Sequence, residues 1–313
     1  MTKNNNNKMM TATTTTTTTA NAQDVEAKLR ELQNWFENEP NLPEKIEPIS
    51  LLRFLKCVEY DTDKTKALIQ LNYSLRNKNP NIFIDRNMDH EMTAKGLRVS
   101  DLIILPGVTP DRHKLLLFRL ADLDPRTRNS VEESKIFFMM ADARFTEPDI
   151  ERSPDELSAH GAENHSAHIF DDDIADGDVQ IVDISGYTMR HLAYVSIFVL
   201  RVYMKFLHEA YPSRLRAIHV INCPSFLDRM MAMMKPFIRE EVYQMINYHT
   251  EGMDSLYELI PRDMLPMEYG GKAGTVDEIK QRWLRILKEK TAYLSDEKYW
   301  KVTSESKSRW SWF

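Results

Sequence analysis

Apolar residues recur at helical spacing in the first part of the chain. Val25, Leu29, Leu32 and Phe36 lie three or four positions apart, which predicts a helix that begins near Gln23. Three prolines between positions 40 and 48 end this helix. Further helices are predicted over Ser50–Lys56 and from Asp63 to about Leu75, with Asp61 or Asp63 as the N-cap of the latter. This part is predicted to form a small all-helical module.

From about residue 101 the pattern changes to short apolar runs that alternate with longer helical stretches. The predicted strands are Leu115–Leu120, Val179–Asp183 and Ala217–Ile221. The predicted helices are Val131–Phe145, Met189–Tyr211, Ser225–Tyr243 with a break at Pro236, and a stretch from residue 275 to about Leu294. Strands that alternate with helices indicate an α/β fold with a mostly parallel sheet.

Two segments carry no such pattern. Residues 1–22 hold an Asn run and the threonines Thr13–Thr19, which cannot bury apolar surface and predict a disordered tail. A mitochondrial presequence is disfavoured because the segment contains no arginine. Residues 146–178 are acidic and predict a mobile surface insertion. The predicted domains are therefore 23–95, helical, and 96–274, α/β, followed by a C-terminal helix and tail over 275–313.

Composition narrows the class of protein. The chain has 313 residues, with 41 Lys and Arg against 47 Asp and Glu, so its formal net charge is −6. This acidic excess argues against a dedicated nucleic-acid binder. The cysteines, Cys57 and Cys223, form neither a disulfide framework nor a zinc site. No apolar run approaches the ~20 residues that span a bilayer, so we expect a cytoplasmic protein that associates with membranes only transiently. We also expect a monomer.

Patterns typical of enzymes are missing from the sequence. There is no Gly-rich phosphate loop and no GxSxG elbow. His160, His165 and His168 lie in the acidic insertion at spacings that fit no common metal motif. Asp183 at a strand end favours a structural role, and His219, between apolar neighbours, favours a core histidine. We therefore expect no enzymatic activity, no cofactor and no metal.

Methionine is concentrated in one predicted helix. Met230, Met231, Met233 and Met234 follow one another closely, and Phe226, Met230, Met233 and Phe237 would form one stripe at helical spacing. A second soft cluster is formed by Phe137–Met140. Methionine suits surfaces that adapt to a variable partner, and two such clusters would suit an apolar cavity of ligand size. Composition alone favours plain core packing over such a cavity.

Five sequence motifs occur in the order and at the distances of a known family: Leu51–Lys56, Val182–Tyr187, Tyr211–Asn222, Lys235–Phe237 and Leu265–Gly271. Over Gln23–Leu294 the chain resembles the CRAL-TRIO family, whose members carry lipids such as tocopherol and retinaldehyde. The resemblance implies an α/β lipid-binding domain, with a mostly parallel sheet and flanking helices, preceded by a small all-helical domain. It also implies a mobile helical gate, which by position is Pro224–Tyr243.

The resemblance further implies which side chains line the ligand pocket: Ser134, Phe137, Phe138, Ala141, Gln180, Val182, Tyr203, Phe206, Leu207, Tyr211 and Ile218. Gln180, Ser134 and Tyr203 would bond the one polar group of an isoprenoid such as a retinoid or tocopherol, and a phospholipid is the alternative ligand. The implied gate residues are Phe226, Leu227, Met230, Met233, Met234 and Phe237.

Membrane docking is implied in part. Arg214 and Arg216 match two positions of a basic cluster that binds phosphoinositide headgroups in the tocopherol carriers. Other positions of that cluster are occupied here by Val58, Glu241 and Met245, which are not basic. Lys235 and Arg239 would substitute for them in generic attraction to anionic lipid. A tail with Trp310 and Trp312 is suited to a membrane interface.

The resemblance, together with the absence of enzyme motifs, implies a non-enzymatic lipid carrier. It would bind one hydrophobic molecule in an internal pocket and exchange it at membranes by opening the gate. The alternative is an adaptor that uses the same fold to recruit proteins through the acidic insertion.

Overall fold

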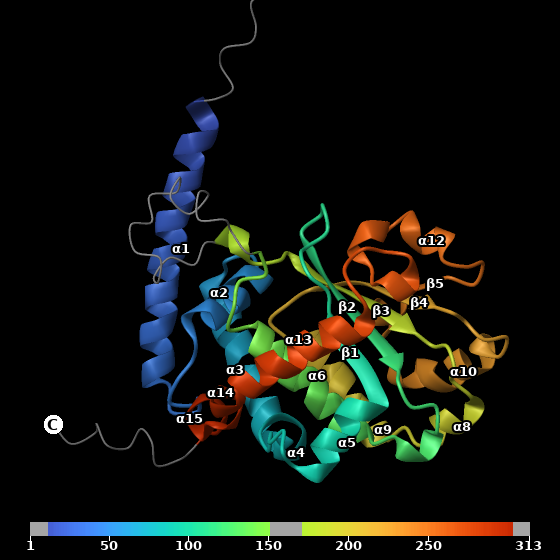
Figure 1. Ribbon diagram of the computed structural model, residues 1–313. Helices are drawn as coiled ribbons and strands as arrows, with labels where there is room; N and C mark the ends of the chain where they lie inside the picture. The colour runs from blue at the N-terminus through green and yellow to red at the C-terminus, as the bar shows by residue number, and fades with distance from the viewer. Residues whose placement is uncertain (1–11, 151–170, 303–313) are drawn as a thin grey trace, which may run out of the picture.

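The computed structural model describes residues 12–150 and 171–302, which form a helical N-terminal part beside an α/β part (Figure 1). The N-terminal helices are α1 (Ala12–Asn38), α2 (Pro48–Cys57), α3 (Thr62–Lys78), α4 (Pro80–Phe83) and α5 (Glu91–Val99). The Asp61 carboxylate caps α3 by accepting a hydrogen bond from the Lys64 amide at 3.0 Å, which confirms the N-cap prediction.

The core of the helical part joins the apolar faces of α1, α2 and α3. Leu32 and Phe36 of α1 are fully buried against Leu51 and Leu55 of α2 and Ile69 of α3. These positions recur at the helical spacing that predicted the helices, so each helix places one apolar stripe in a shared core.

A mixed sheet of five strands in the order β1-β2-β3-β4-β5 organises the α/β part. The strands are β1 (Ser100–Ile104), β2 (His113–Leu120), β3 (Gly177–Asp183), β4 (Leu215–Ile221) and β5 (Ile246–Tyr248). β1 is antiparallel to β2, and the remaining pairs are parallel. The mostly parallel sheet that the pattern predicted is confirmed.

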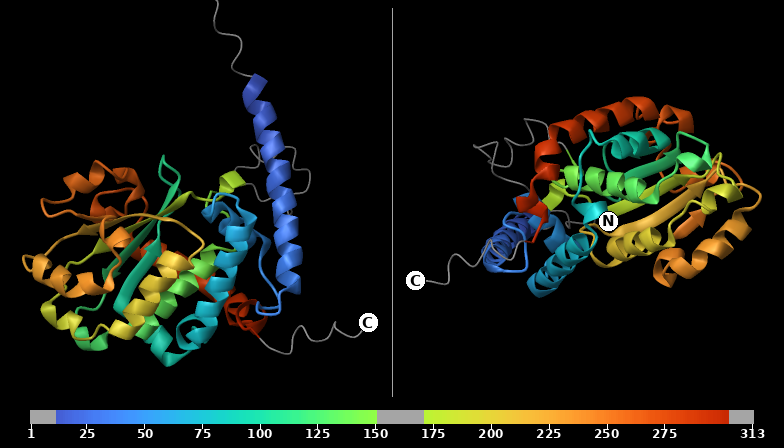
Figure 2. Two further views of the ribbon diagram at one scale, coloured as in Figure 1. Left: turned by 180° about the vertical axis from the view of Figure 1, so that it is seen from behind. Right: turned by 90° about the horizontal axis from the view of Figure 1, so that it is seen from below.

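Successive side chains of a strand point to opposite faces of the sheet, and each face has its own cover. On one face lie α6 (Ser130–Arg144) and α9 (Ile197–Glu209), seen from behind in Figure 2. On the other, Leu115, Leu117 and Ile181 pack against the segment that runs from Met253 to Ile279. The Trp283 indole of α13 (Val276–Glu289) donates to the Ile104 carbonyl at 2.8 Å and fixes that helix beside β1.

The remaining elements are short. They are η1 (Pro125–Thr127), η2 (Asp171–Asp173), α8 (Met189–Leu192), α10 (Leu227–Met234), η3 (Lys235–Phe237), α11 (Glu240–Tyr243), α12 (Asp254–Tyr257), η4 (Arg262–Met264), η5 (Met267–Tyr269), α14 (Thr291–Ser295) and α15 (Glu297–Trp300). The predicted break at Pro236 is confirmed, because α10 ends before it and the chain continues as η3.

Three predicted boundaries are wrong. The disordered tail does not extend to residue 22, because α1 continues back to Ala12; adding residues to an existing helix costs little compared with starting one. Residues 1–11 and 303–313, with the aromatic tail, lie outside the described residues. The predicted helix Met189–Tyr211 is interrupted between α8 and α9, where Ser130 Oγ bonds the Tyr194 carbonyl and the Ser196 amide.

The third correction concerns the acidic insertion. Its two ends are not a surface loop: Asp149, Asp173, Ile174 and Asp178 are buried, and β3 already begins at Gly177. The Asp149 and Ile150 amides bond the Asp173 carbonyl, so the ends of the insertion lie side by side. Residues 151–170, with the three histidines, lie outside the described residues.

Candidate functional site

An apolar cavity of about 380 Å³ lies between the sheet and the helices α6 and α9. Its floor is made of two rows of side chains that cross four strands in register. One row is Leu116, Gln180, Ile218 and Ile246, and the other is Phe118, Val182, Val220 and Tyr248. Neighbouring strands present their alternate residues to the same face, so the register alone builds this floor.

The two helices contribute one face each to the cavity wall. On α6 this face is Ser130, Glu133, Ser134 and Phe137, and on α9 it is Val199, Leu200, Tyr203 and Met204. The spacing of three and four residues is that of a single helix face. Both helices therefore point a continuous stripe towards the floor strands.

A Met-rich segment also lines the cavity. Met230, Met231 and Met234 of α10 line it together with Ile238 and Val242. The predicted single stripe is wrong for Met233, whose side chain is 51% exposed. Phe226 and Leu227 pack instead on Ile184 and Val220, and the Phe237 ring receives the Arg201 guanidinium at 5.5 Å. The stripe fails because the helix ends before Pro236, so helical spacing does not continue to Phe237.

The predicted pocket residues fall into two groups. Ser134, Phe137, Gln180, Val182, Tyr203 and Ile218 line the cavity, whereas Phe138, Ala141, Phe206, Leu207 and Tyr211 do not. These five belong to the core between α6, α9 and the helical part. The Phe83 ring of α4 lies 4.5 Å from those of Phe138 and Phe206, and Tyr211 packs between Phe137 and Phe145.

Polar groups that the sequence did not single out also line the cavity. Arg128 and Glu133 form an ion pair on its wall, and Arg128 Nη1 donates to the Tyr187 hydroxyl at 2.6 Å. Ser100 Oγ and the Tyr248 hydroxyl are buried without a hydrogen-bond partner among the residues described here. Burial raises the pKa of Tyr248 to about 12. The only sequence signal for the Arg128–Glu133 pair was the presence of two opposite charges near the start of a predicted helix.

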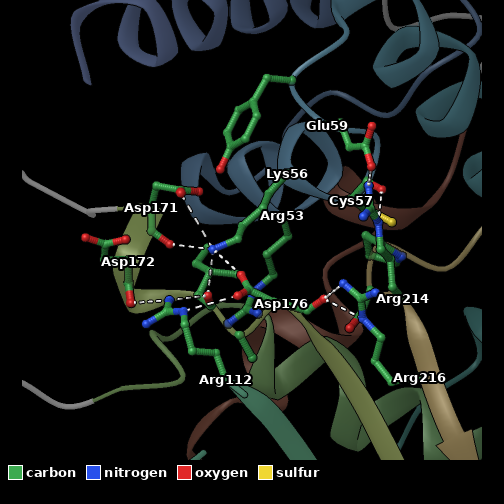
Figure 3. Close-up of a pocket in the computed structure, with 15 residues that line it drawn as sticks. Arg53, Lys56, Cys57, Glu59, Arg112, Asp171, Asp172, Asp176, Arg214 and Arg216 are labelled. Atoms are coloured by element: carbon green, nitrogen blue, oxygen red, sulfur yellow. Dashed lines mark hydrogen bonds and ion pairs between the residues drawn. The ribbon is translucent and has the colours of Figure 1, made fainter. Parts of the chain in front are cut away.

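A second, polar cleft of about 410 Å³ lies where α2 meets the turn before β2 and the start of β4 (Figure 3). Its cations come from Arg53, Lys56, Arg112, Arg214 and Arg216. Asp176 Oδ1 lies 2.9 Å from Lys56 Nζ and Asp176 Oδ2 lies 3.3 Å from Arg112 Nε, while Arg216 donates to the Asp176 carbonyl. Burial works against the charge of Asp176, but its bonds to Lys56 and Arg112 hold its pKa below the ordinary value.

The predicted membrane residues are divided between this cleft and another surface. Arg214 and Arg216 line the cleft. Lys235 and Arg239 lie outside it: Lys235 lies over the Tyr243 ring, and Arg239 Nη1 donates to Glu209 at 2.6 Å. Arg214 Nε donates to the Cys57 carbonyl, and Arg214 Nη2 lies 3.2 Å from Glu59 Oε1.

The isolated candidates for catalysis have structural partners. Asp183 accepts hydrogen bonds from the Tyr269 hydroxyl at 2.7 Å, the Asn222 amide and the Ser185 backbone. His219 is buried and bonded to His249, as predicted for a core histidine. Within residues 12–150 and 171–302, no group of three or more His, Cys, Asp or Glu is placed to hold a metal ion. Over the same ranges no helix is long and apolar enough to cross a bilayer.

Comparisons with known proteins identify the class to which this fold belongs. A family model described as "CRAL/TRIO domain" matches residues 99–271, and one described as "Pinta-like, UBA domain" matches residues 21–93. The chain belongs to the CRAL-TRIO family, with a UBA-like helical domain before the CRAL-TRIO domain. The predicted family and fold class are confirmed.

Individual relatives are distant. The human protein "Alpha-tocopherol transfer protein-like" is 24% identical over 238 residues, which are 76% of this chain and 62% of the relative. Human "Clavesin-2" is 22% identical over 241 residues, which are 76% of this chain and 65% of that protein. The match thus spans less than two thirds of either relative. The crystal structure of Sfh5 superposes with a TM-score of 0.44 at 13% identity, over 92% of this chain and 100% of that one.

Proposed function

We propose that this protein is a non-enzymatic carrier that binds one hydrophobic molecule in the apolar cavity and transfers it between membranes. The observation that carries the proposal is the cavity itself, whose floor is formed by register across four strands and whose wall includes a Met-rich segment. A cover that must release and readmit a ligand needs an adaptable apolar face, which flexible methionine side chains supply. The names of the tocopherol-transfer-like relatives point in the same direction.

The size and lining of the cavity favour a ligand with a single chain or ring system. Its volume of about 380 Å³ is in the lower part of the range of ~300–1,000 Å³ for pockets that hold small ligands. An isoprenoid with one polar end suits this cavity better than a diacyl phospholipid. Burial of its apolar surface would supply most of the affinity, at about 25 cal/mol per Å² before the costs of binding.

Contact with membranes is supported by two surfaces. Phe198 of α9 is 65% exposed and Met233 of α10 is 51% exposed, on the helices that border the cavity. Exposed apolar side chains beside a ligand cavity suit transient insertion into a bilayer. The polar cleft, with Arg214 and Arg216, would add electrostatic attraction to anionic lipid.

The test is mass spectrometry of an organic extract of the purified chain after incubation with a lipid-rich lysate. We expect one enriched neutral lipid near equimolar amounts, and its loss from Leu200→Trp, which fills the cavity from α9. Phe198→Trp, on the exposed side of the same helix, should retain the lipid. A folded, monodisperse protein with no enriched lipid would contradict the proposal and favour the adaptor.

A further inference from the structure

One pair of charged side chains, Arg128 and Glu133, lies on the mostly apolar cavity wall. Arg128 Nε donates to Glu133 Oε1 at 2.9 Å, and Arg128 Nη2 bonds the second oxygen of the same carboxylate. The two side chains are 10% and 13% exposed. Among the described residues that line the cavity, Arg128 and Glu133 are the charged ones. The pair lies at the junction of η1 and α6, at one end of the cavity.

The fold gives little reason to keep charges there. A buried ion pair gains about as much from attraction as it loses by leaving water, and apolar residues of similar size often serve stability equally well. Binding cavities, in contrast, commonly hold a few oriented polar groups that select the ligand. The position of the pair on a cavity wall therefore points to the ligand rather than to stability.

The hydrogen bonds made by the Tyr187 hydroxyl leave its proton available to a ligand. The Tyr187 hydroxyl accepts from Arg128 Nη1 at 2.6 Å, and its own proton has no acceptor among the residues described here. Burial raises the pKa of Tyr187, so its hydroxyl stays protonated at neutral pH. Arg128 thereby orients Tyr187 as a donor with one hydrogen bond left to give.

The net charge around Tyr187 restricts which polar group of a ligand its hydroxyl can bond. The Arg128–Glu133 pair is neutral as a whole, and both carboxylate oxygens are engaged by Arg128. A carboxylate or phosphate brought to Tyr187 would add a buried negative charge that nothing neutralises, because the charge of Arg128 is already balanced by Glu133. A hydroxyl, aldehyde, ketone or ester oxygen accepts the same hydrogen bond without that cost.

We propose that Tyr187, held by the Arg128–Glu133 pair, selects neutral lipids with one oxygen acceptor at their polar end and excludes free fatty acids. This selection rests on the carrier function proposed above. Tyr187 acts on the ligand directly, and Arg128 and Glu133 act as positioning residues that also set the net charge at this end of the cavity.

The experiment compares palmitic acid with its alcohol and its aldehyde, which share one chain and differ at the polar end. Binding to the purified full chain is measured by competition with a fluorescent lipid, at a pH where palmitate is ionised. We expect the alcohol and aldehyde to bind about tenfold more tightly than palmitate, because the unpaired charge of palmitate costs more to bury than its stronger hydrogen bond returns. Glu133→Gln, which leaves Arg128 positively charged, should tighten palmitate binding by about tenfold and change the alcohol little.

Matched surface variants serve as controls. Asp124 pairs with the exposed Arg126 outside the cavity, so Asp124→Asn should leave all three affinities unchanged. Tyr187→Phe should weaken the alcohol and aldehyde about fivefold, whereas Tyr194→Phe, at an exposed tyrosine, should not. Tyr187→Phe changes no charge and gives an independent result if Glu133→Gln does not fold.

The outcomes separate the two proposals. Wild-type protein that binds all three lipids equally, or a folded Glu133→Gln variant with the wild-type preference, would overturn the selection by Tyr187 alone. Wild-type protein that binds none of the lipids, and retains none from the lysate, would overturn the carrier function and the selection with it.

Discussion

Arg53 of α2 donates a hydrogen bond from Nη1 to Oδ2 of Asp149 at 2.7 Å, with both side chains buried. The other oxygen of Asp149 accepts from Arg144 Nε of α6, also at 2.7 Å. Burial works against the charge of Asp149, but the two guanidinium groups outweigh it and hold its pKa well below the ordinary value. One carboxylate at the base of the acidic insertion thus ties the helical part to the α/β part.

Replacing this carboxylate should destabilise the protein severely. Asp149→Asn leaves the buried Arg53 guanidinium without its counter-charge and leaves Arg144 with Asp178 alone. We expect a loss of about 3–5 kcal/mol in the free energy of unfolding. Urea denaturation followed by circular dichroism measures it. Asp172→Asn is the matched control, because this exposed residue contributes its carbonyl and not its carboxylate to Arg112. Equal stability of the two variants would contradict a central role for Asp149.

The order of the elements was predictable from the sequence, because apolar runs bounded by polar residues mark α2, α6, β2, β3 and β4. The short strand β5 and the edge strand β1 were missed, because three to five residues are too few to show a recognisable apolar pattern. Asp149 was missed for another reason. A run of acidic residues is usually solvated, and only the fold brings Arg53 and Arg144 to it.

The cavity was predictable as a feature of the fold but not residue by residue. The resemblance placed Phe206 in the pocket, but the side of α9 that carries it is taken by Phe83 of α4. Helical spacing predicts which residues form the apolar face of a helix. It does not predict which other element packs against that face. The Arg128–Glu133 pair was missed because its placement on the cavity wall depends on packing between η1, α6 and the start of α8.

A shortened insertion should discriminate between carrier and adaptor. Deleting all of 146–178 would remove Asp149 and the start of β3 and would unfold the domain. The Ile150 amide lies 3.2 Å from the Asp173 carbonyl, so a short Gly-Ser linker can replace 151–170. We expect this variant to keep its lipid and its unfolding midpoint, measured by mass spectrometry and urea denaturation. Retained lipid with loss of a protein partner captured by the wild type would support the adaptor.

The buried histidine pair should make stability depend on pH. Ser255 Oγ donates its proton to the Gly252 carbonyl, so it accepts a hydrogen bond from His249 Nδ1. His249 Nε2 is then unprotonated and accepts from His219 Nδ1 at 3.0 Å. Both rings are therefore neutral, and burial and His249 lower the pKa of His219 from 6.5 to about 4.

The sign of the effect follows from proton uptake. Between pH 6.5 and about 4 the unfolded chain binds a proton that folded His219 does not, so this stabilisation is complete above 6.5 and is lost as the pH falls. We expect a loss of about 1–3 kcal/mol across that window. Urea denaturation of wild type and His219→Gln at neutral and mildly acidic pH measures it. A pH dependence unchanged in His219→Gln would contradict this origin.

Transfer to membranes should depend on the exposed apolar residues beside the cavity. Phe198→Ser and Met233→Ser remove apolar contacts with the bilayer without touching the cavity wall. We expect unchanged lipid binding and transfer between vesicles slowed about tenfold, followed by fluorescence of a labelled lipid. Leu259→Ser is the control, because this residue is 58% exposed but lies on the part of the molecule that covers the opposite sheet face. Equal slowing by all three would show a general effect of surface polarity.

The polar cleft should bind anionic membranes more tightly when its internal counter-charge is removed. Asp176 contacts Lys56 and Arg112 with its carboxylate and Arg216 with its carbonyl (Figure 3). Asp176→Asn keeps the carbonyl bond and removes the carboxylate that Lys56 and Arg112 share, while Lys56 stays 3.6 Å from Asp171 Oδ2. We expect about fivefold tighter binding to vesicles that contain phosphatidylserine, since each basic charge contributes ~1 kcal/mol near such a surface.

The same Asp172→Asn variant controls for a general change in net charge, because the Asp172 carboxylate points away from the cleft in Figure 3. The gain from Asp176→Asn should disappear at high salt, where surface charges are screened. It should also disappear when Arg216→Gln is added, since Arg216 lies in the same cleft. Flotation of vesicles with bound protein measures each case. Equal binding by Asp176→Asn and Asp172→Asn would show that membranes do not approach this cleft.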